Sequence, residues 1–214
     1  VFSSNYELYG DLSARMMQTI ESLVPAIEVY SIDECFADVS GMTDLSALGK
    51  QIRDRVLQWV GIPTCVGIAP TKTLAKFCNH LAKQHPVFKG VVNWSVWSAD
   101  IQQRALKSQA VSEVWGIGYR ISSALNDMGI ETVLDFVQAD TATLRRRFGV
   151  VIERTQKELQ GIPCADLQLI APDKQQIVRS RSFGSPVTDL DGLSSSLSFH
   201  VAEGMKDLRQ QNST

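Results

Sequence analysis

The sequence predicts an α+β fold, because short β-type runs and longer helical repeats of apolar residues are segregated along the chain. Runs with strand character lie mainly in the first 100 residues, whereas residues 101–162 show only the helical period. A polar stretch with two prolines, residues 163–176, has the composition of a linker. After it, residues 177–214 contain one alternating segment and one amphipathic helix, too little to close a core of their own.

Each expected element follows from the spacing of its apolar residues. Helices end at Pro25, Gly61, Gly129 and Gly161, where proline or glycine interrupts the period. The helices so predicted span residues 6–23, 45–60, 71–84, 121–128, 132–137, 143–159 and 193–208. The segments with strand character are residues 27–32, 35–39, 62–68, 90–92 and 177–183.

Composition and charge narrow the class of protein. A chain of 214 residues with 44% hydrophobic residues can bury one substantial core or two small ones. Residues 1–50 carry two basic and eight acidic residues, while residues 51–214 carry 19 basic and 15 acidic ones, a modest asymmetry that suits a nucleic-acid enzyme. No membrane-spanning run or signal peptide is found, and four cysteines without a Cys-x-x-Cys pair favour reduced thiols in the cytosol.

Two adjacent carboxylates, Asp33 and Glu34, join the first two strand-like arms. Neighbouring side chains on a straight strand point to opposite faces, but a tight turn can aim both into one space. Carboxylates that close repel each other unless a proton or a cation lies between them. Hard divalent cations such as Mg²⁺ take carboxylate oxygens and leave positions for substrate phosphates. The pair therefore predicts a metal site for nucleotidyl transfer, or else a solvated hairpin turn.

Two further segments carry candidate phosphate-binding groups. On the helix over residues 71–84, Lys72, Lys76 and Lys83 lie on the same side. This side of the helix is either exposed to solvent or binds phosphate. Residues 116–118, Gly-Ile-Gly, precede the next helix, whose first turn carries Arg120. This is either a plain glycine-rich turn or a helix-hairpin-helix that binds the DNA backbone through N–H groups. The Arg145–Arg147 run is interpreted as solvated, and the three histidines suggest no metal site.

Taken in order, these motifs resemble one known family. Ser-Ile-Asp-Glu at residues 31–34 is similar to the palm hairpin of Y-family, translesion DNA polymerases, most closely the UmuC-like branch (the ImpB/MucB/SamB family). Residues 67–76 with Ala82-Lys83 are similar to the segment that follows this hairpin, and Ser-Arg-Ser-Phe-Gly at 180–184 is similar to the opening strand of the little finger.

The resemblance implies part of a right-handed polymerase. Its expected parts are a palm over residues 1–100, with the end of the fingers at 1–10, a helical thumb with the helix-hairpin-helix over 101–162, a linker over 163–176, and the truncated start of a little finger over 177–214. The family's first palm strand, which supplies another metal-binding aspartate, has no counterpart here, and the sequence begins at Val1. We therefore expect a fragment that does not polymerise alone.

For the whole protein, the resemblance implies Mg²⁺-dependent, template-directed nucleotidyl transfer in error-prone repair during the SOS response. Asp33 would bridge two Mg²⁺ ions, Glu34 would bind the one nearer the primer, and Lys83 with Lys76 would hold the triphosphate. The residues implied to meet the DNA are Gly116, Ile117, Gly118, Arg120, Arg179 and Arg181.

The partners implied are primer–template DNA, deoxynucleoside triphosphates, a UmuD-like subunit, a sliding clamp and a recombinase filament, in the bacterial cytoplasm and away from membranes. Two other classes stay open on the residues alone. One is a DNA-binding module without catalysis, in which the acidic pair is only a turn. The other is a palm-fold enzyme that acts on free nucleotides, such as a cyclase, although such an enzyme has no use for the Gly-Ile-Gly turn.

Overall fold

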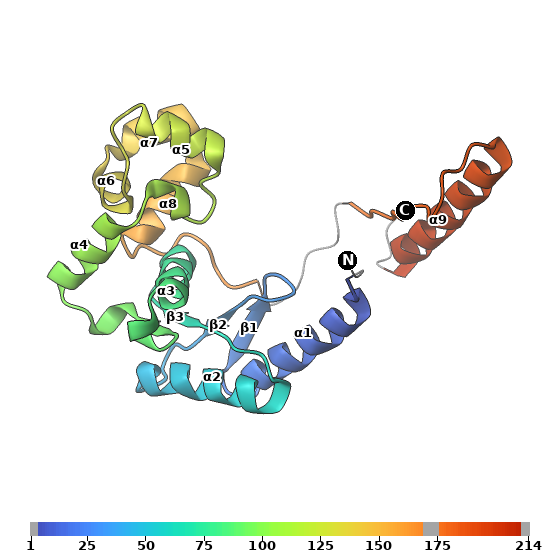
Figure 1. Ribbon diagram of the computed structural model, residues 1–214. Helices are drawn as coiled ribbons and strands as arrows, with labels where there is room; N and C mark the ends of the chain where they lie inside the picture. Colours follow the sequence, from blue (N-terminus) through green and yellow to red (C-terminus); the bar gives the residue numbers. More distant parts are fainter. Residues whose placement is uncertain (1–3, 169–175, 211–214) are drawn as a thin grey trace. The chain divides into compact units, whose positions relative to one another are not determined.

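The computed structural model describes residues 4–168 and 176–210. The chain divides into two compact units, Val1–Leu169 and Ile170–Thr214, and each is described by itself (Figure 1). No helix in the described residues is long and apolar enough to cross a membrane. The four cysteines are all free thiols.

The first unit mixes helices with short strands, as the α+β prediction requires. Its strands are β1 (Ala26–Val29), β2 (Cys35–Asp38), β3 (Val66–Ile68) and β4 (Val91–Asn93). Its helices are α1 (Tyr6–Glu21), α2 (Leu45–Val60), α3 (Lys72–Gln84), α4 (Ala99–Ser108), α5 (Tyr119–Asn126), α6 (Val133–Gln138), α7 (Thr141–Phe148) and α8 (Val150–Leu159). The second unit contains α9 (Leu190–Gln210).

The strands form two small sheets. β1 and β2 make an antiparallel hairpin in which Val29 pairs with Cys35, so the five residues between them form the turn. β3 and β4 pair in parallel, with α3 as the crossover between them. Gly67 lets β3 lie directly on α3, because a Cβ at this position would be 2.2 Å from the carbonyl oxygen of Ala75.

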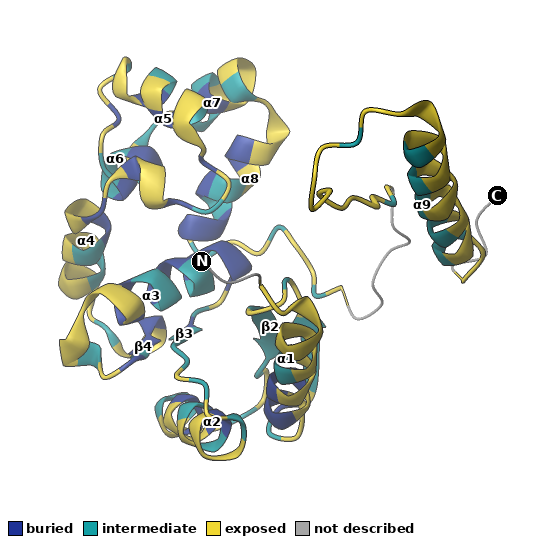
Figure 2. Cartoon of the chain, turned by 45° about the vertical axis from the view of Figure 1, so that its right-hand side comes forward, coloured by how far each residue is buried: buried dark blue, intermediate teal, exposed yellow. Residues whose placement is uncertain are grey.

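Two apolar cores hold the first unit together. One joins α1, α2 and the hairpin; its buried members are Met16, Met17, Ile20, Val24, Leu48, Ile52 and Val56. The other runs from α3 through β4 into α4–α8, with Phe77, Leu81, Leu125, Phe136, Leu144 and Ile152 among its members. Figure 2 shows buried stretches on α3 and α8, two helices that contribute members of this second core.

Glu158, on α8, forms hydrogen bonds to the first turn of α3 through its carboxylate and its backbone carbonyl. The carboxylate accepts the backbone N–H of Thr73 at 2.9 Å, and the backbone carbonyl of Glu158 accepts the hydroxyl of Thr71 at 2.7 Å. A carboxylate at the positive end of a helix is electrostatically favoured there. The last helix of the unit is thereby bonded to the first turn of α3.

Three sequence-based expectations are wrong in the structure. The helix expected over residues 143–159 is two helices, because Gly149 adopts φ 88° and breaks the backbone between α7 and α8. The strand expected over residues 62–68 is confined to its last three residues. The strand expected over residues 177–183 has no regular secondary structure, since no second strand pairs with it among residues 176–210.

Residues 169–175 of the expected linker lie outside the described residues. The first part of this linker, residues 163–168, is bonded to the first unit instead of being free. The backbone N–H of Cys164 donates to Glu158 at 3.3 Å, and that of Gln168 donates to Glu28 at 2.7 Å. The polar, Pro-containing composition gave no sign of these hydrogen bonds.

Candidate active site

The turn between β1 and β2 is closed by its own backbone. The N–H groups of Tyr30 and Ser31 both donate to the carbonyl oxygen of Glu34 at 3.0 Å. The hydroxyl of Ser31 donates to the carboxylate of Asp33 at 2.8 Å. The turn thus leaves Asp33 exposed and Glu34 half-buried at the end of the hairpin.

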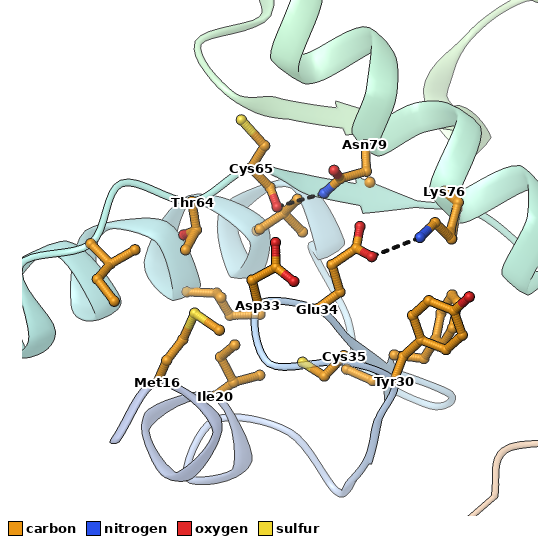
Figure 3. Close-up of a pocket in the computed structure, with 18 of the residues that line it drawn as sticks. Met16, Ile20, Tyr30, Asp33, Glu34, Cys35, Thr64, Cys65, Lys76 and Asn79 are labelled. Atoms are coloured by element: carbon orange, nitrogen blue, oxygen red, sulfur yellow. Dashed lines mark hydrogen bonds and ion pairs between the residues drawn. The ribbon is translucent and has the colours of Figure 1, made fainter. Parts of the chain in front are cut away.

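Asp33 and Glu34 both line one cavity of about 680 Å³. Figure 3 shows their carboxylates pointing to the same side of the hairpin, into the space in front of β3 and α3. Lys76, Asn79 and Lys83 of α3 line the same cavity. The tight turn therefore does bring two neighbouring carboxylates into one space.

Lys76 faces these carboxylates. Its ammonium nitrogen lies 2.9 Å from Oε2 of Glu34, in a pair whose side chains are 23% and 33% exposed. The same nitrogen lies 4.7 Å from the centre of the Tyr30 ring and 5.5 Å from that of Trp115. Aromatic faces attract cations, so the rings and the carboxylate hold the ammonium together. The interpretation of this helix side as a solvated face is wrong at Lys76.

Lys72 is more deeply buried, one turn earlier on α3. It forms an ion pair with Glu28 of β1, and the two side chains are 9% and 12% exposed. It also donates to the carbonyl oxygen of Asp166 at 2.7 Å. Since Glu28 accepts from Gln168 as well, this buried pair joins the hairpin, α3 and the segment that follows α8.

The remaining residues of the same helix side differ in role. Asn79 donates to the carbonyl oxygen of Cys65 at 2.7 Å and so attaches α3 to the residue before β3. Lys83 is exposed while it lines the cavity. Of the basic residues on this side, Lys83 alone is exposed in the described structure and keeps the solvent access that a phosphate ligand requires.

The cavity also contains a thiol. Cys35 follows Glu34 directly, and burial raises the pKa of its thiol to about 11. The thiolate is the form that acts as nucleophile or metal ligand. At neutral pH Cys35 is therefore in the thiol form and lines the cavity as a small apolar residue.

The candidate metal ligands in this cavity are the carboxylates of Asp33 and Glu34. Among residues 4–168 and 176–210, no group of three or more His, Cys, Asp or Glu side chains is arranged to hold a metal ion. Mg²⁺ commonly binds through one or two carboxylates and fills its other positions with water and substrate phosphates. Two carboxylates that point into an open cavity fit this mode of binding.

The Gly-Ile-Gly turn lies at the start of α5. Gly116 has φ 87°, which disfavours other residues, and Gly118 is the N-cap of the helix in extended conformation. Ile117 is buried and anchors the turn in the second core. Tyr119 and Arg120 follow and are exposed, so the first turn of α5 is open to solvent.

The second unit has its own arginines. Arg179 forms an ion pair with Asp207 of α9, whereas Arg181 is exposed and has no ion-pair partner among the described residues. Their shared strand face does not exist here, because residues 176–183 are not a strand.

Sequence reasoning missed two aromatic residues of the site, Tyr30 and Trp115. Trp115 Nε1 donates to the hydroxyl of Tyr30 at 3.0 Å, and their rings meet edge to face with centres 5.4 Å apart. Each is adjacent to a motif that the sequence did mark, the acidic turn and the Gly-Ile-Gly turn. Nothing in the sequence signals that residues 85 positions apart touch.

Comparison with known proteins shows similarity to one family. Residues 1–80 match the model of the impB/mucB/samB family. The chain is 46% identical to protein UmuC of Salmonella typhimurium, over 99% of this chain and 50% of that protein. Over these matched lengths the chain is similar to the impB/mucB/samB family. It spans about half the length of such relatives.

The likeness extends to proteins named as polymerases. DNA polymerase IV of Moorella thermoacetica is 30% identical over 82% of this chain and 42% of that protein. The solved insertion ternary complex of Dbh DNA polymerase superposes with a TM-score of 0.58, at 26% identity, over 72% of this chain and 44% of that one. The chain therefore has a Y-family polymerase-like mixed α/β fold with small sheets and many helices.

Proposed function

We propose that this chain is part of an error-prone translesion DNA polymerase, in which the β1–β2 turn carries the acid pair of the nucleotidyl-transfer site. The observation that supports this most is the joint presence of Asp33 and Glu34 at one open cavity with Lys76 and Lys83 opposite them. Similarity to the impB/mucB/samB family and to DNA polymerase IV suggests the reaction.

In this proposal Asp33 and Glu34 hold a divalent cation, with Mg²⁺ as the expected ion. When bound, such an ion polarises phosphate oxygens and stabilises the charge that develops in phosphoryl transfer. Lys83 supplies a fixed positive charge for the triphosphate, and Lys76 keeps Glu34 oriented until substrate arrives.

The domain assignment follows the same family. Residues 1–100 would be palm with the end of the fingers at 1–10, residues 101–162 the thumb, residues 163–176 the linker and residues 177–214 the start of the little finger. The Gly116–Gly118 turn with Arg120 would contact the DNA backbone, together with Arg179 and Arg181. Binding to a UmuD-like subunit, a sliding clamp and a recombinase filament stays a prediction.

The test is primer extension by the complete gene product, with Mg²⁺ and a primed template. We expect Asp33→Asn to lower kcat by more than about a hundredfold, the effect of removing an element of transition-state electrostatics. Primer–template affinity, measured by fluorescence anisotropy, should stay close to wild type. The matched control is Asp38→Asn, since Asp38 lies on the same hairpin but lines a different cavity and accepts from the backbone N–H of Ser40.

Three outcomes separate the candidate functions. Loss of extension in Asp33→Asn alone supports the polymerase. Equal extension by wild type and Asp33→Asn would show that Asp33 is only a turn residue. DNA binding without extension in any variant would favour a DNA-binding module that lacks catalysis.

A further inference from the structure

An aromatic cluster connects the acidic hairpin with the Gly-Ile-Gly turn. Tyr30 and Phe36 come from the hairpin, and Trp115 immediately precedes Gly116. The three ring centres lie between 5.4 and 5.7 Å from one another. Edge-to-face and tilted arrangements at these separations are the favourable ones for aromatic pairs.

The cluster does not fill either core. Val114 and Ile117, on the two sides of Trp115, are 4% and 5% exposed and fix the backbone in the second core. Trp115 itself is half-buried and reaches the hairpin, while Tyr30 remains 45% exposed. The hydrogen bond between Trp115 Nε1 and the Tyr30 hydroxyl, 3.0 Å long, fixes the position of the two side chains relative to each other.

Both aromatic residues also contact the groups that hold Glu34. The backbone N–H of Tyr30 donates to the Glu34 carbonyl oxygen. The rings of Tyr30 and Trp115 flank the ammonium of Lys76, which bonds the Glu34 carboxylate. Displacement of Trp115 would therefore change the surroundings of Lys76 as well as the position of the glycine turn.

We propose that Tyr30 and Trp115 are positioning residues that hold the Gly116–Gly118 turn in register with the acid pair. A nucleic-acid backbone bound at that turn is then held at a set distance from Asp33 and Glu34. Neither aromatic residue touches the reacting atoms, since each acts through the turn and through Lys76. This inference rests on the polymerase function proposed above.

The test compares Tyr30→Phe and Trp115→Phe in the complete gene product. Each substitution keeps a ring but removes one end of the hydrogen bond between Trp115 Nε1 and the Tyr30 hydroxyl. Because small displacements of a bound reactant are costly to the rate, we expect kcat of primer extension to fall about tenfold in each. Primer–template Kd should change less than about twofold, because the groups proposed to meet DNA are intact.

The double variant and a control make the comparison specific. The double variant that carries both Tyr30→Phe and Trp115→Phe should extend primers no more slowly than either single variant. The reason is that both substitutions remove the same hydrogen bond, between Trp115 Nε1 and the Tyr30 hydroxyl. Trp59→Phe is the matched control, since Trp59 is 59% exposed on α2 and stacks on Arg55. Unchanged kcat in both single variants, additive losses, or an equal proportional rise in Kd would overturn the proposal.

A second measurement detects the contact between Tyr30 and Trp115 independently of primer extension. With 5-fluorotryptophan in the complete gene product, the fluorine NMR signal that Trp115→Phe removes identifies Trp115. Tyr30→Phe should move this signal and leave those of Trp59, Trp94 and Trp97 in place. A stationary signal would show that the contact is absent. If Asp33→Asn extends primers like wild type, the polymerase function fails and the positioning role fails with it. If Asp33→Asn loses extension but Tyr30→Phe and Trp115→Phe extend primers like wild type, only the positioning role is refuted.

Discussion

Lys72 and Lys76 show how burial separates two residues of the same type. They lie one turn apart on α3, and each bonds a carboxylate of the hairpin. Lys72 with Glu28 is almost entirely removed from water, while Lys76 with Glu34 keeps solvent contact. Partly exposed ion pairs are screened by water, whereas a buried charge that loses its partner is strongly destabilising.

We therefore expect Lys72→Met to lower the free energy of unfolding by about 3–5 kcal/mol, because Glu28 then lacks a counter-charge and, among the described residues, keeps only the hydrogen bond from Gln168. Lys76→Met should cost about 1 kcal/mol or less, as an exposed pair does. Urea unfolding at pH 7 measures both. Adding Glu28→Gln to Lys72→Met should restore most of the loss, and equal losses in the two single lysine variants would contradict this assignment.

At the scale of elements, one acidic residue of α8, Glu153, forms an ion pair with α7. Glu153 is buried beside the break at Gly149 and accepts from Lys157 at 2.7 Å and Arg145 at 2.9 Å. The hydrogen bond from Lys157, with the charges of Arg145 and Lys157, holds the pKa of the Glu153 carboxyl below its ordinary value of 4.5. The ionised form is thus favoured in the folded state.

A carboxyl whose pKa is lower in the folded state contributes stability above its ordinary pKa, and that contribution is lost as pH falls through the folded pKa. Wild type should therefore exceed Glu153→Gln in unfolding free energy at pH 7, and the difference should shrink steadily below pH 4.5. Urea unfolding of both proteins across this range is the measurement. A difference that grew on acidification would contradict the role of the ionised carboxylate.

The first turn of α5 is the element that we propose for DNA backbone contact. Arg120 is exposed there, next to the N–H groups at the positive end of the helix. Arg120→Gln should reduce the slope of log affinity against log salt by about 1, with little dependence on DNA sequence. Arg55→Gln on α2 is the control of equal charge change, and an equal slope change in both variants would indicate a general charge effect.

At the scale of the whole molecule, burial is distributed unevenly between the two units. Every buried residue in the described part of the chain lies in the first unit, and α9 has none, as Figure 2 shows. Exposed apolar side chains such as Leu197 and Phe199 line α9. The second unit, as described, therefore contains no core of its own.

It follows that removal of residues 170–214 should hardly change the stability of the first unit. We expect the Tm to shift by less than about 3 °C, the change that 1 kcal/mol produces in a chain of this size. Scanning calorimetry on both lengths measures this. A large fall in Tm would show that the second unit supports the first.

Local features of the site were predictable. The turn at Asp33 and Glu34 follows from two flanking β-type arms, and Gly61 marks the end of α2 as expected. The continuous helix over residues 143–159 was wrong because apolar spacing alone does not reveal the φ of 88° at Gly149. The strand at residues 177–183 was wrong because alternation records which residues could share a face, while a strand needs a hydrogen-bonding partner.

The sequence by itself determined the acid pair, the glycine turn, most helices and the likeness to one polymerase family, since each depends on residues close together in the chain. The tertiary structure decided which groups meet. It paired Lys72 with Glu28 and Lys76 with Glu34, held residues 163–168 on the first unit, and placed Trp115 on Tyr30. These contacts join segments 42 to 140 positions apart, and only the packing of the cores brings such segments together.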